Sequence, residues 1–260
     1  MPRRDRDRLR PRTAWRGLQV PQSEGRAHLW LRLVLRRLAG RPALFRHYIF
    51  DLDGTLIDSA ADLVAATNFT LAELGVAEQP SAAIVGYVGS GARKLIERAL
   101  VAARVSSSSV EIDRALEVFL RYYADHLLDR TQPFPGVPEV VAQLRASGAR
   151  LSVLSNKPRG FSCAVLEGLG LLSSFFRVIG GDELDSRKPD PEGAHLLIEE
   201  SRVSVGATLL VGDSVIDVET ARAASVDACG VLWGFGEPSE LRTARPRFLI
   251  EQPAELIGLG

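Results

Sequence analysis

The sequence predicts an α/β fold: a Rossmann-like, three-layer core on a parallel sheet, with an all-helical cap domain inserted near its start. Three observations predict it. From His47 onward, short apolar runs alternate with longer helical patterns, as in sheets whose strands are joined by helices. Residues 60–130 interrupt this alternation with helical patterns alone. Polar and acidic residues follow several apolar runs, where parallel sheets bind their ligands.

Six strands are expected, each a short apolar run: 48–50, 150–154, 177–179, 208–211, 228–232 and 248–250. Four helical patterns lie between them: 137–147, 158–169, 191–202 and 215–224. Pro158 suits a first helical turn, while Gly148 and Gly170 suit helix ends. The alternation implies parallel strands joined by right-handed crossovers.

The interval 60–130 is expected to hold helices near 62–74, 92–103 and 111–127 and no strand. We expect residues 47–59 and 131–260 to form the core and residues 60–130 to form the cap. The cap would act as a lid over the carboxyl edge of the sheet, with its two connections as hinges. The alternative is a set of helices packed rigidly on the core.

The amino-terminal segment differs from the rest. Residues 1–46 contain 13 arginines and three acids, whereas residues 47–260 contain 19 basic and 29 acidic residues. The apolar run 29–38 is interrupted by arginines, so neither a membrane span nor a secretory signal is expected. Composition favours a disordered extension or residues upstream of the true start. A basic segment that contacts anionic lipid or nucleic acid is the alternative, and no nucleic-acid partner is expected for the core.

The chain of 260 residues, 46% hydrophobic, is long enough for one large or two modest domains. Its two cysteines, Cys163 and Cys229, lie in apolar runs without the spacing of a metal site. Buried thiols in a reducing compartment are expected, and hence a cytoplasmic location.

The first strand ends in Asp51-Leu52-Asp53-Gly54-Thr55. Residues two apart lie on the same side of a strand, so both carboxylates converge and repel unless a cation, a proton or a reaction uses them. A calcium loop is the alternative. It requires a third ligand, a glycine and a glutamate at positions that are occupied here by Thr55, Leu56 and Asp62.

Further polar residues follow other strands: Ser155-Asn156-Lys157-Pro158, Arg187-Lys188-Pro189 and Gly212-Asp213-Ser214-Val215-Ile216-Asp217. Taken singly, each of these residues also suits a purely structural role. Ser155 suits a helix cap, Lys188 a solvated surface charge, and the aspartates the start of a helix. Together they place four carboxylates, a hydroxyl and an ammonium at one edge, a set that suits Mg²⁺ and a phosphate.

In this order the motifs resemble those of the haloacid dehalogenase superfamily of phosphohydrolases: Asp-x-Asp-Gly-Thr, a serine or threonine, a lysine, and Gly-Asp-Ser followed by a second aspartate. The resemblance covers about residues 47–250. Within that superfamily the chain is most similar to the phosphoglycolate phosphatases, through residues 85–92, 97–100, 155–158 and 178–182.

The resemblance implies a magnesium-dependent phosphatase with an aspartyl-phosphate intermediate. Asp51 would be the nucleophile and Asp53 the general acid and base. Mg²⁺ would be held by Asp51, by the backbone carbonyl of Asp53 and by Asp213, with Asp217 in or just behind the ligand shell.

The resemblance also implies how the phosphate is held. Ser155 and Lys188 would bind the transferring phosphoryl group. Thr55 would orient Asp53, and the backbone around Gly54 and Asn156 would add amide donors.

The expected substrate is a small phosphorylated metabolite, first among them 2-phosphoglycolate. Arg93 follows a glycine-rich loop and is the candidate for binding the substrate carboxylate, with a surface pair to Glu97 as the alternative. Sugar phosphates, nucleoside monophosphates and pyrophosphate suit the core equally well. The sequence leaves the oligomeric state open.

Rival functions follow from the same residues. Dehalogenases of the superfamily lack the second aspartate, so dehalogenation is not expected. A sugar-phosphate phosphatase or a phosphomutase would use the same core. A non-catalytic binding protein would show a lost ligand, and none is lost here.

Overall fold

The computed structural model describes residues 45–105 and 108–259. The predictions for the arginine-rich segment therefore fall, up to residue 44, outside the described residues. A six-stranded sheet lies at the centre, in the order β5-β4-β1-β6-β7-β8, and all its pairings are parallel. Its strands are β1 (His47–Phe50), β4 (Arg150–Leu154), β5 (Arg177–Ile179), β6 (Thr208–Gly212), β7 (Asp227–Val231) and β8 (Phe248–Ile250).

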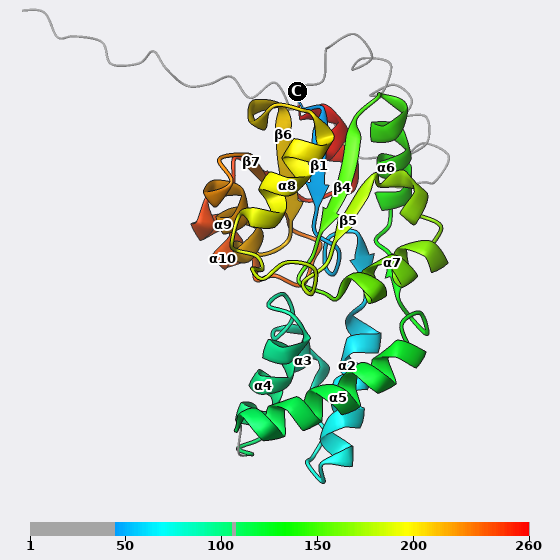
Figure 1. Cartoon of the computed structure of the whole chain (residues 1–260), viewed down its shortest axis with the longest axis vertical. Helices are drawn as coiled ribbons and strands as arrows, with labels where there is room; N and C mark the ends of the chain where they lie inside the picture. The colour runs from blue at the N-terminus through cyan, green and yellow to red at the C-terminus, as the bar shows by residue number, and fades with distance from the viewer. Residues whose placement is uncertain (1–44, 106–107, 260) are drawn as a thin grey trace, which may run out of the picture. The chain divides into compact units, whose positions relative to one another are not determined.

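Helices cover both faces of this sheet (Figure 1). Tyr48 and Phe50 of β1 point into a core shared with α6 (Val137–Ala146) and α7 (Arg159–Gly168). Ile49 points into a second core, shared with α8 (Glu192–Ser201), α9 (Val215–Ala223) and α10 (Pro238–Ala244). This alternation along one strand confirms the expected three-layer α/β core.

The predicted strand and helix boundaries lie within two residues of the observed ones. Pro158 has an extended backbone and precedes α7 instead of lying in its first turn. Helix α10 had no predicted counterpart. Gly148 and Gly170 have φ values of 86° and 69° and follow α6 and α7, as expected of helix ends. Three short 3₁₀ segments complete the core: η1 (Leu172–Ser174), η2 (Val205–Ala207) and η3 (Pro253–Gly258).

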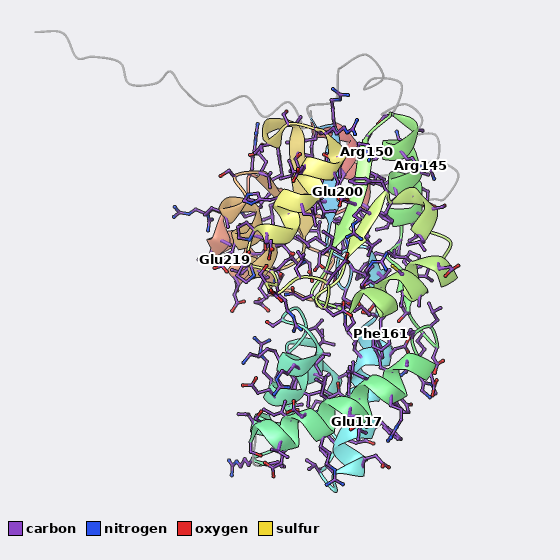
Figure 2. All side chains as sticks on the ribbon, in the orientation of Figure 1. Glu117, Arg145, Arg150, Phe161, Glu200 and Glu219 are labelled. Atoms are coloured by element: carbon purple, nitrogen blue, oxygen red, sulfur yellow. The ribbon has the colours of Figure 1, made fainter. Side chains whose placement is uncertain are left out.

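The described residues between 60 and 130 contain helices and no strand, as expected. The helices are α2 (Ala60–Glu73), α3 (Ser81–Val85), α4 (Ala92–Ala102) and α5 (Ser109–Asp125), which together we call the helical insert. The insert has a hydrophobic core of its own, which includes Leu71, Ile96, Phe119 and Tyr123. Phe161 of α7 lies where the core meets this insert (Figure 2), and its ring packs edge-on against Tyr123.

The two connections to the insert pair with each other, which the sequence did not predict. Strand β2 (Ile57–Asp58) runs antiparallel to β3 (Gln132–Pro133). Beside this ribbon, the carboxylate of Asp62 accepts hydrogen bonds from the backbone of Arg130 and Thr131 at 3.0 and 2.8 Å and from the Thr131 hydroxyl at 2.7 Å. The entry and exit of the insert are therefore held side by side, and a hinge there stays a prediction.

Within the described residues, no helix has the length and apolarity needed to cross a membrane. Both cysteines are unpaired. Cys229 is buried as expected, whereas Cys163 is only partly buried.

Candidate active site

The candidate site lies at the carboxyl ends of three neighbouring strands. Asp51 follows β1, Ser155 follows β4 and Asp213 follows β6, and these strands are adjacent in the sheet. One carboxylate oxygen from each of Asp51, Asp213 and Asp217 lies within 4.8 Å of the others. The structure thus brings together three of the four carboxylates that the sequence singled out.

Lys188 joins two of these carboxylates. Its Nζ lies 2.8 Å from Asp51 Oδ1 and 2.7 Å from Asp217 Oδ1, and its side chain is 3% exposed. Burial alone would lower the pKa of Lys188, but the charges of Asp217 and Asp51 outweigh it, and the pKa lies above its ordinary value. Lys188 therefore remains an ammonium, and the alternative of a solvated surface charge is wrong.

One ammonium does not balance three buried carboxylates. Burial raises the pKa of Asp51 to about 8, with Lys188 opposing the rise and the charges of Asp217 and Asp213 adding to it. Burial and the charge of Asp217 likewise raise the pKa of Asp213 to about 7. The cluster of oxygen ligands is short of positive charge, and a divalent cation of the magnesium type fits both its charge and its donor atoms.

Asp213 is positioned by a loop after β7 that the sequence analysis did not single out. Its Oδ2 accepts hydrogen bonds from the backbone N–H groups of Phe235 and Gly236, at 2.7 and 3.0 Å. A Cβ on Gly234 would lie 2.3 Å from both Asp213 Cβ and the Gly54 carbonyl oxygen, so only glycine fits there. The signal was present in the sequence, because Gly234 and Gly236 lie in the loop that follows a strand at the ligand-binding edge.

Asp217 is held at the start of α9. Its Oδ2 accepts hydrogen bonds from the backbone N–H and the hydroxyl of Ser214, at 3.1 and 2.6 Å, in a capping box. This leaves Oδ1 for Lys188. The Asp217 side chain therefore has two roles: it caps α9 and it contacts Lys188 in the carboxylate cluster. The expectation that it only caps a helix describes one of the two.

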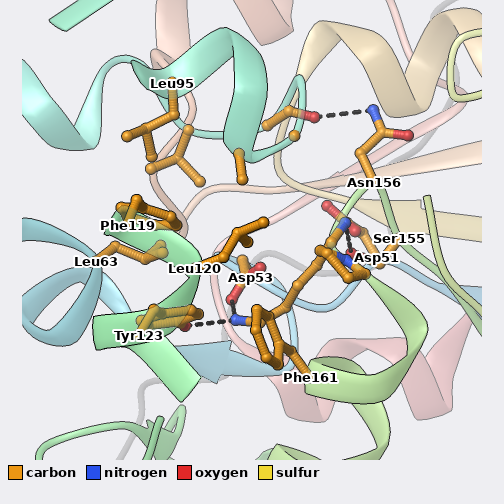
Figure 3. A pocket seen from close by; sticks show the side chains of 16 residues that line it. Asp51, Asp53, Leu63, Leu95, Phe119, Leu120, Tyr123, Ser155, Asn156 and Phe161 are labelled. Atoms are coloured by element: carbon orange, nitrogen blue, oxygen red, sulfur yellow. Dashed lines mark hydrogen bonds and ion pairs between the residues drawn. The ribbon is translucent and has the colours of Figure 1, made fainter. Parts of the chain in front are cut away.

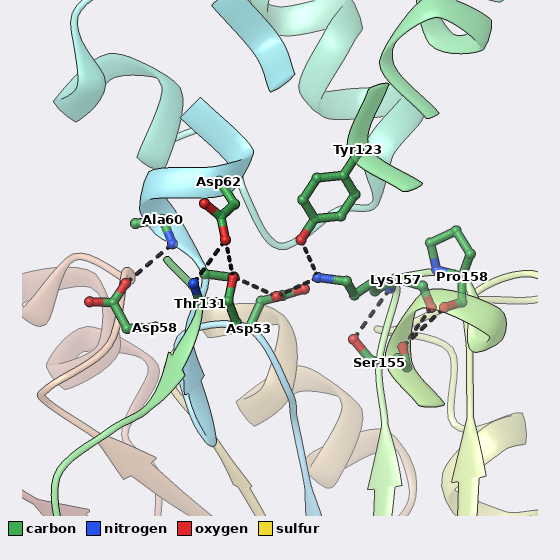
Figure 4. A network of polar contacts seen from close by, with 11 residues as sticks. Asp53, Asp58, Ala60, Asp62, Tyr123, Thr131, Ser155, Lys157 and Pro158 are labelled. Carbon is green, nitrogen blue, oxygen red and sulfur yellow. Dashed lines mark hydrogen bonds and ion pairs between the residues drawn. The ribbon is translucent and has the colours of Figure 1, made fainter. Parts of the chain in front are cut away.

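Asp53 lies in a separate polar network (Figure 4). Its Oδ1 accepts a hydrogen bond from the Ser59 hydroxyl at 2.6 Å and lies 2.9 Å from Lys157 Nζ. Thr55, expected to orient Asp53, has a buried hydroxyl with no partner in the described part of the chain. The hydroxyl that contacts Asp53 belongs to Ser59, which corrects the expectation.

Lys157 is the site residue that sequence reasoning missed. Its Nζ also donates to the Tyr123 hydroxyl of α5 at 2.6 Å, which ties the core to the helical insert. Burial alone would lower the pKa of Lys157. The charge of Asp53 and the Tyr123 hydroxyl outweigh that effect, and the pKa lies above its ordinary value. Lys157 stands two residues after Ser155, and the same two-residue spacing that singled out Asp51 and Asp53 would have found it.

The residues expected around the phosphate lie beside Asp51. Ser155 is buried, and its hydroxyl accepts a hydrogen bond from the Lys157 backbone at 3.3 Å. The side-chain amide of Asn156 donates to the carbonyl oxygens of Gly89 and Lys188, at 3.0 and 3.1 Å. Gly54 has φ of 83°, and its N–H donates to the Ile57 carbonyl oxygen, so that amide is already engaged.

A pocket between the core and the insert joins Asp51 and Asp53 (Figure 3). On the core side, its wall combines the polar residues Ser155, Asn156 and Lys157 with the apolar residues Pro158 and Phe161. Its wall on the insert side is apolar except for Tyr123, and is formed by Leu63, Val88, Leu95, Phe119 and Leu120. A small ligand with a charged end would suit such walls.

Arg93 does not line this pocket. Its guanidinium pairs with Asp113 of α5, and its side chain is 40% exposed. The alternative pairing with Glu97 is also wrong, because Glu97 pairs with Lys94 at 2.7 Å. The expectation that Arg93 binds the substrate carboxylate is therefore corrected.

Comparisons with known proteins agree with this geometry. The family model of haloacid dehalogenase-like hydrolases matches residues 48–231. A phosphoglycolate phosphatase of Rhodospirillum rubrum is 41% identical over 191 residues, covering 72% of this chain and 79% of that protein. One of Colwellia psychrerythraea is 35% identical over 212 residues, covering 80% and 94%. The crystal structure of a predicted phosphoglycolate phosphatase from Haemophilus somnus aligns with a TM-score of 0.79 at 26% identity, covering 84% of this chain and 99% of that one.

Proposed function

The chain belongs to the haloacid dehalogenase-like hydrolase family, and we propose that it is a magnesium-dependent phosphatase that hydrolyses 2-phosphoglycolate to glycolate and phosphate. The observation that carries this proposal is the placement of Asp51 and Asp53 in one pocket, each beside its own buried lysine. The relatives named phosphoglycolate phosphatase support the choice of substrate.

In the proposed first step, an oxygen of Asp51 attacks phosphorus and the bond from phosphorus to the alcohol oxygen breaks. Asp53 gives its proton to that oxygen, so glycolate leaves and an aspartyl-phosphate remains on Asp51. In the second step, Asp53 takes a proton from water, which attacks phosphorus and releases phosphate and free Asp51. Ser59 and Lys157 hold Asp53 in place for both transfers.

Lys188 and Ser155 are proposed to bind the oxygens of the transferring phosphoryl group, because both lie beside Asp51. Asp51, Asp213 and Asp217 would hold Mg²⁺, together with the backbone carbonyl of Asp53. The ion would supply positive charge that offsets the repulsion between a carboxylate nucleophile and an anionic substrate.

We further propose that residues 60–130 act as a cap on a core formed by residues 47–59 and 131–260. The insert contributes Tyr123 to the network of Asp53, so its position affects the chemistry. The cytoplasmic location stays a prediction from the unpaired cysteines.

The test is phosphate release from a panel of small phosphomonoesters, with Mg²⁺ and with excess chelator. Preference for 2-phosphoglycolate that disappears with chelator supports the proposal, as does a rise of melting temperature on adding Mg²⁺ alone. Isomerisation of a hexose phosphate without phosphate release would identify a phosphomutase instead. Mg²⁺ binding with no turnover of any ester would identify a non-catalytic binding protein.

A further inference from the structure

Lys157 is a buried cation to which the proposed binding of the phosphate assigns no role. Its side chain is 5% exposed, yet it lines the same pocket as Asp51 and Asp53. Among the described residues that line this pocket, it is the one with a positive charge. Arg93, the residue that sequence reasoning favoured for a substrate anion, is engaged with Asp113 outside the pocket.

The ammonium of Lys157 has three protons, and the described part of the chain provides partners for two of them. One is donated to Asp53 Oδ1 at 2.9 Å and one to Tyr123 Oη at 2.6 Å. Because Tyr123 accepts this bond, its own hydroxyl proton is also available. Burial raises the pKa of Tyr123 above its ordinary value, which keeps that proton on the hydroxyl. Two donors 2.6 Å apart are thus available to the two oxygens of one carboxylate.

The chemistry of the proposed substrate places its carboxylate at these donors. When the ester oxygen lies within hydrogen-bond reach of Asp53, the carboxylate carbon of 2-phosphoglycolate is two covalent bonds away. Lys157 Nζ is 2.9 Å from the same Asp53 oxygen. A substrate with a neutral group at that position leaves the buried donors unpaired, which costs binding free energy.

We propose that Lys157, together with the Tyr123 hydroxyl, binds the carboxylate of the substrate and thereby selects short phosphorylated 2-hydroxy acids. The inference rests on the proposed function, which it deepens. Helix α5 of the insert is then part of the site that selects the substrate, because α5 carries Tyr123.

Direct binding of non-hydrolysable probes tests the inference. Dissociation constants are measured by calorimetry with Mg²⁺ for 3-phosphonopropionate, which has the carboxylate, and for propylphosphonate, which lacks it. In the unaltered protein we expect a preference of about 100-fold for the carboxylate probe, the size typical of hydrogen bonds to buried charges. In Lys157→Met the preference should fall to within about threefold, and in Tyr123→Phe to an intermediate value.

Two matched controls accompany these variants. Lys94→Met removes an exposed lysine that pairs with Glu97, and Arg187→Met removes an exposed guanidinium that lies near Gly91. Both should keep the preference. Tyr123→Phe retains the buried ring and keeps the test decisive if Lys157→Met does not fold.

A preference that survives in both Lys157→Met and Tyr123→Phe, or that disappears in Arg187→Met instead, overturns the inference. So does an unaltered protein that binds both probes equally, even if it hydrolyses phosphomonoesters. Conversely, selective binding of the carboxylate probe without hydrolysis of 2-phosphoglycolate leaves the inference standing and overturns the proposed function.

Discussion

The carboxylate of Asp51 and the ammonium of Lys188 form a buried ion pair with a separation of 2.8 Å. Asp51 directly follows β1 and Lys188 stands 137 positions later, between β5 and α8. The pair therefore depends on the complete sheet, and Lys188 also holds Asp217 at 2.7 Å. Changes at the two residues should therefore affect chemistry and stability in different ways.

Asp51→Asn should abolish phosphate release, by at least about a thousandfold in kcat, because an amide cannot serve as the nucleophile. It should not lower the melting temperature, since it removes a charge from a crowded buried cluster. Phosphate release and a thermal melt measure the two effects. The matched control is Asp129→Asn, an exposed aspartate that pairs with His126. An Asp51→Asn enzyme as fast as the unaltered chain would refute the mechanism.

Lys188→Met should destabilise the metal-free protein by about 3 kcal/mol, because it leaves Asp51 and Asp217 buried without their cation. Saturating Mg²⁺ should restore part of that stability. Urea denaturation with and without Mg²⁺ measures both quantities, and Lys94→Met serves as the surface control. Equal stability of the two variants without metal would contradict the structural role of Lys188.

Gly234→Ala should lower Mg²⁺ affinity by about tenfold or more, since displacing a residue that supports a ligand commonly has that effect. The added Cβ would collide with Asp213 and with the Gly54 carbonyl. Calorimetric Mg²⁺ titration provides the readout. Gly206→Ala is the control, because a Cβ there meets nothing within 4 Å. Unchanged affinity in Gly234→Ala would mean that Asp213 is not a ligand.

His47 predicts how stability depends on pH. Burial, with a smaller contribution from Arg150, lowers its pKa from 6.5 to about 4. The folded protein thus keeps His47 neutral while the unfolded chain binds a proton. The contribution of His47 to the free energy of unfolding is fully present above the pKa of the unfolded chain. It is lost as pH falls toward 4, on the order of 3 kcal/mol in total.

His47→Asn removes this titration and should give a shallower loss of stability between pH 6.5 and 4. The variant is not expected to match the unaltered stability at neutral pH, because it loses the contact between His47 Nε2 and the Ser152 hydroxyl at 2.9 Å. The comparison is therefore between slopes of the free energy of unfolding against pH. Parallel slopes would show that His47 does not contribute.

The sequence predicted what depends on regular geometry. Residues at the carboxyl ends of adjacent parallel strands must meet, and on that rule Asp51, Asp213 and Lys188 were expected together, as they are. The fold class, the family and the class of phosphoric monoester hydrolase are confirmed. Magnesium, the aspartyl-phosphate and the limits of the cap stay predictions.

What escaped prediction depends on contacts between elements. Arg93 pairs with Asp113 because α4 packs against α5, and the periodicity within one helix does not reveal that packing. Lys157 met Tyr123 across 34 positions of intervening chain. Strands β2 and β3 have two residues each and are too short to leave an apolar pattern. Tertiary packing decided each of these positions.

The ribbon of β2 and β3 has a consequence for how such a protein diversifies. Because Ile57 pairs with Pro133 and Asp58 with Gln132, the chain enters and leaves the helical insert at one point. A segment inherited between those points can be exchanged whole, lengthened or rebuilt without disturbing the order of the sheet. Descendants of one ancestral catalyst can thus acquire new substrates while their reaction chemistry stays the same.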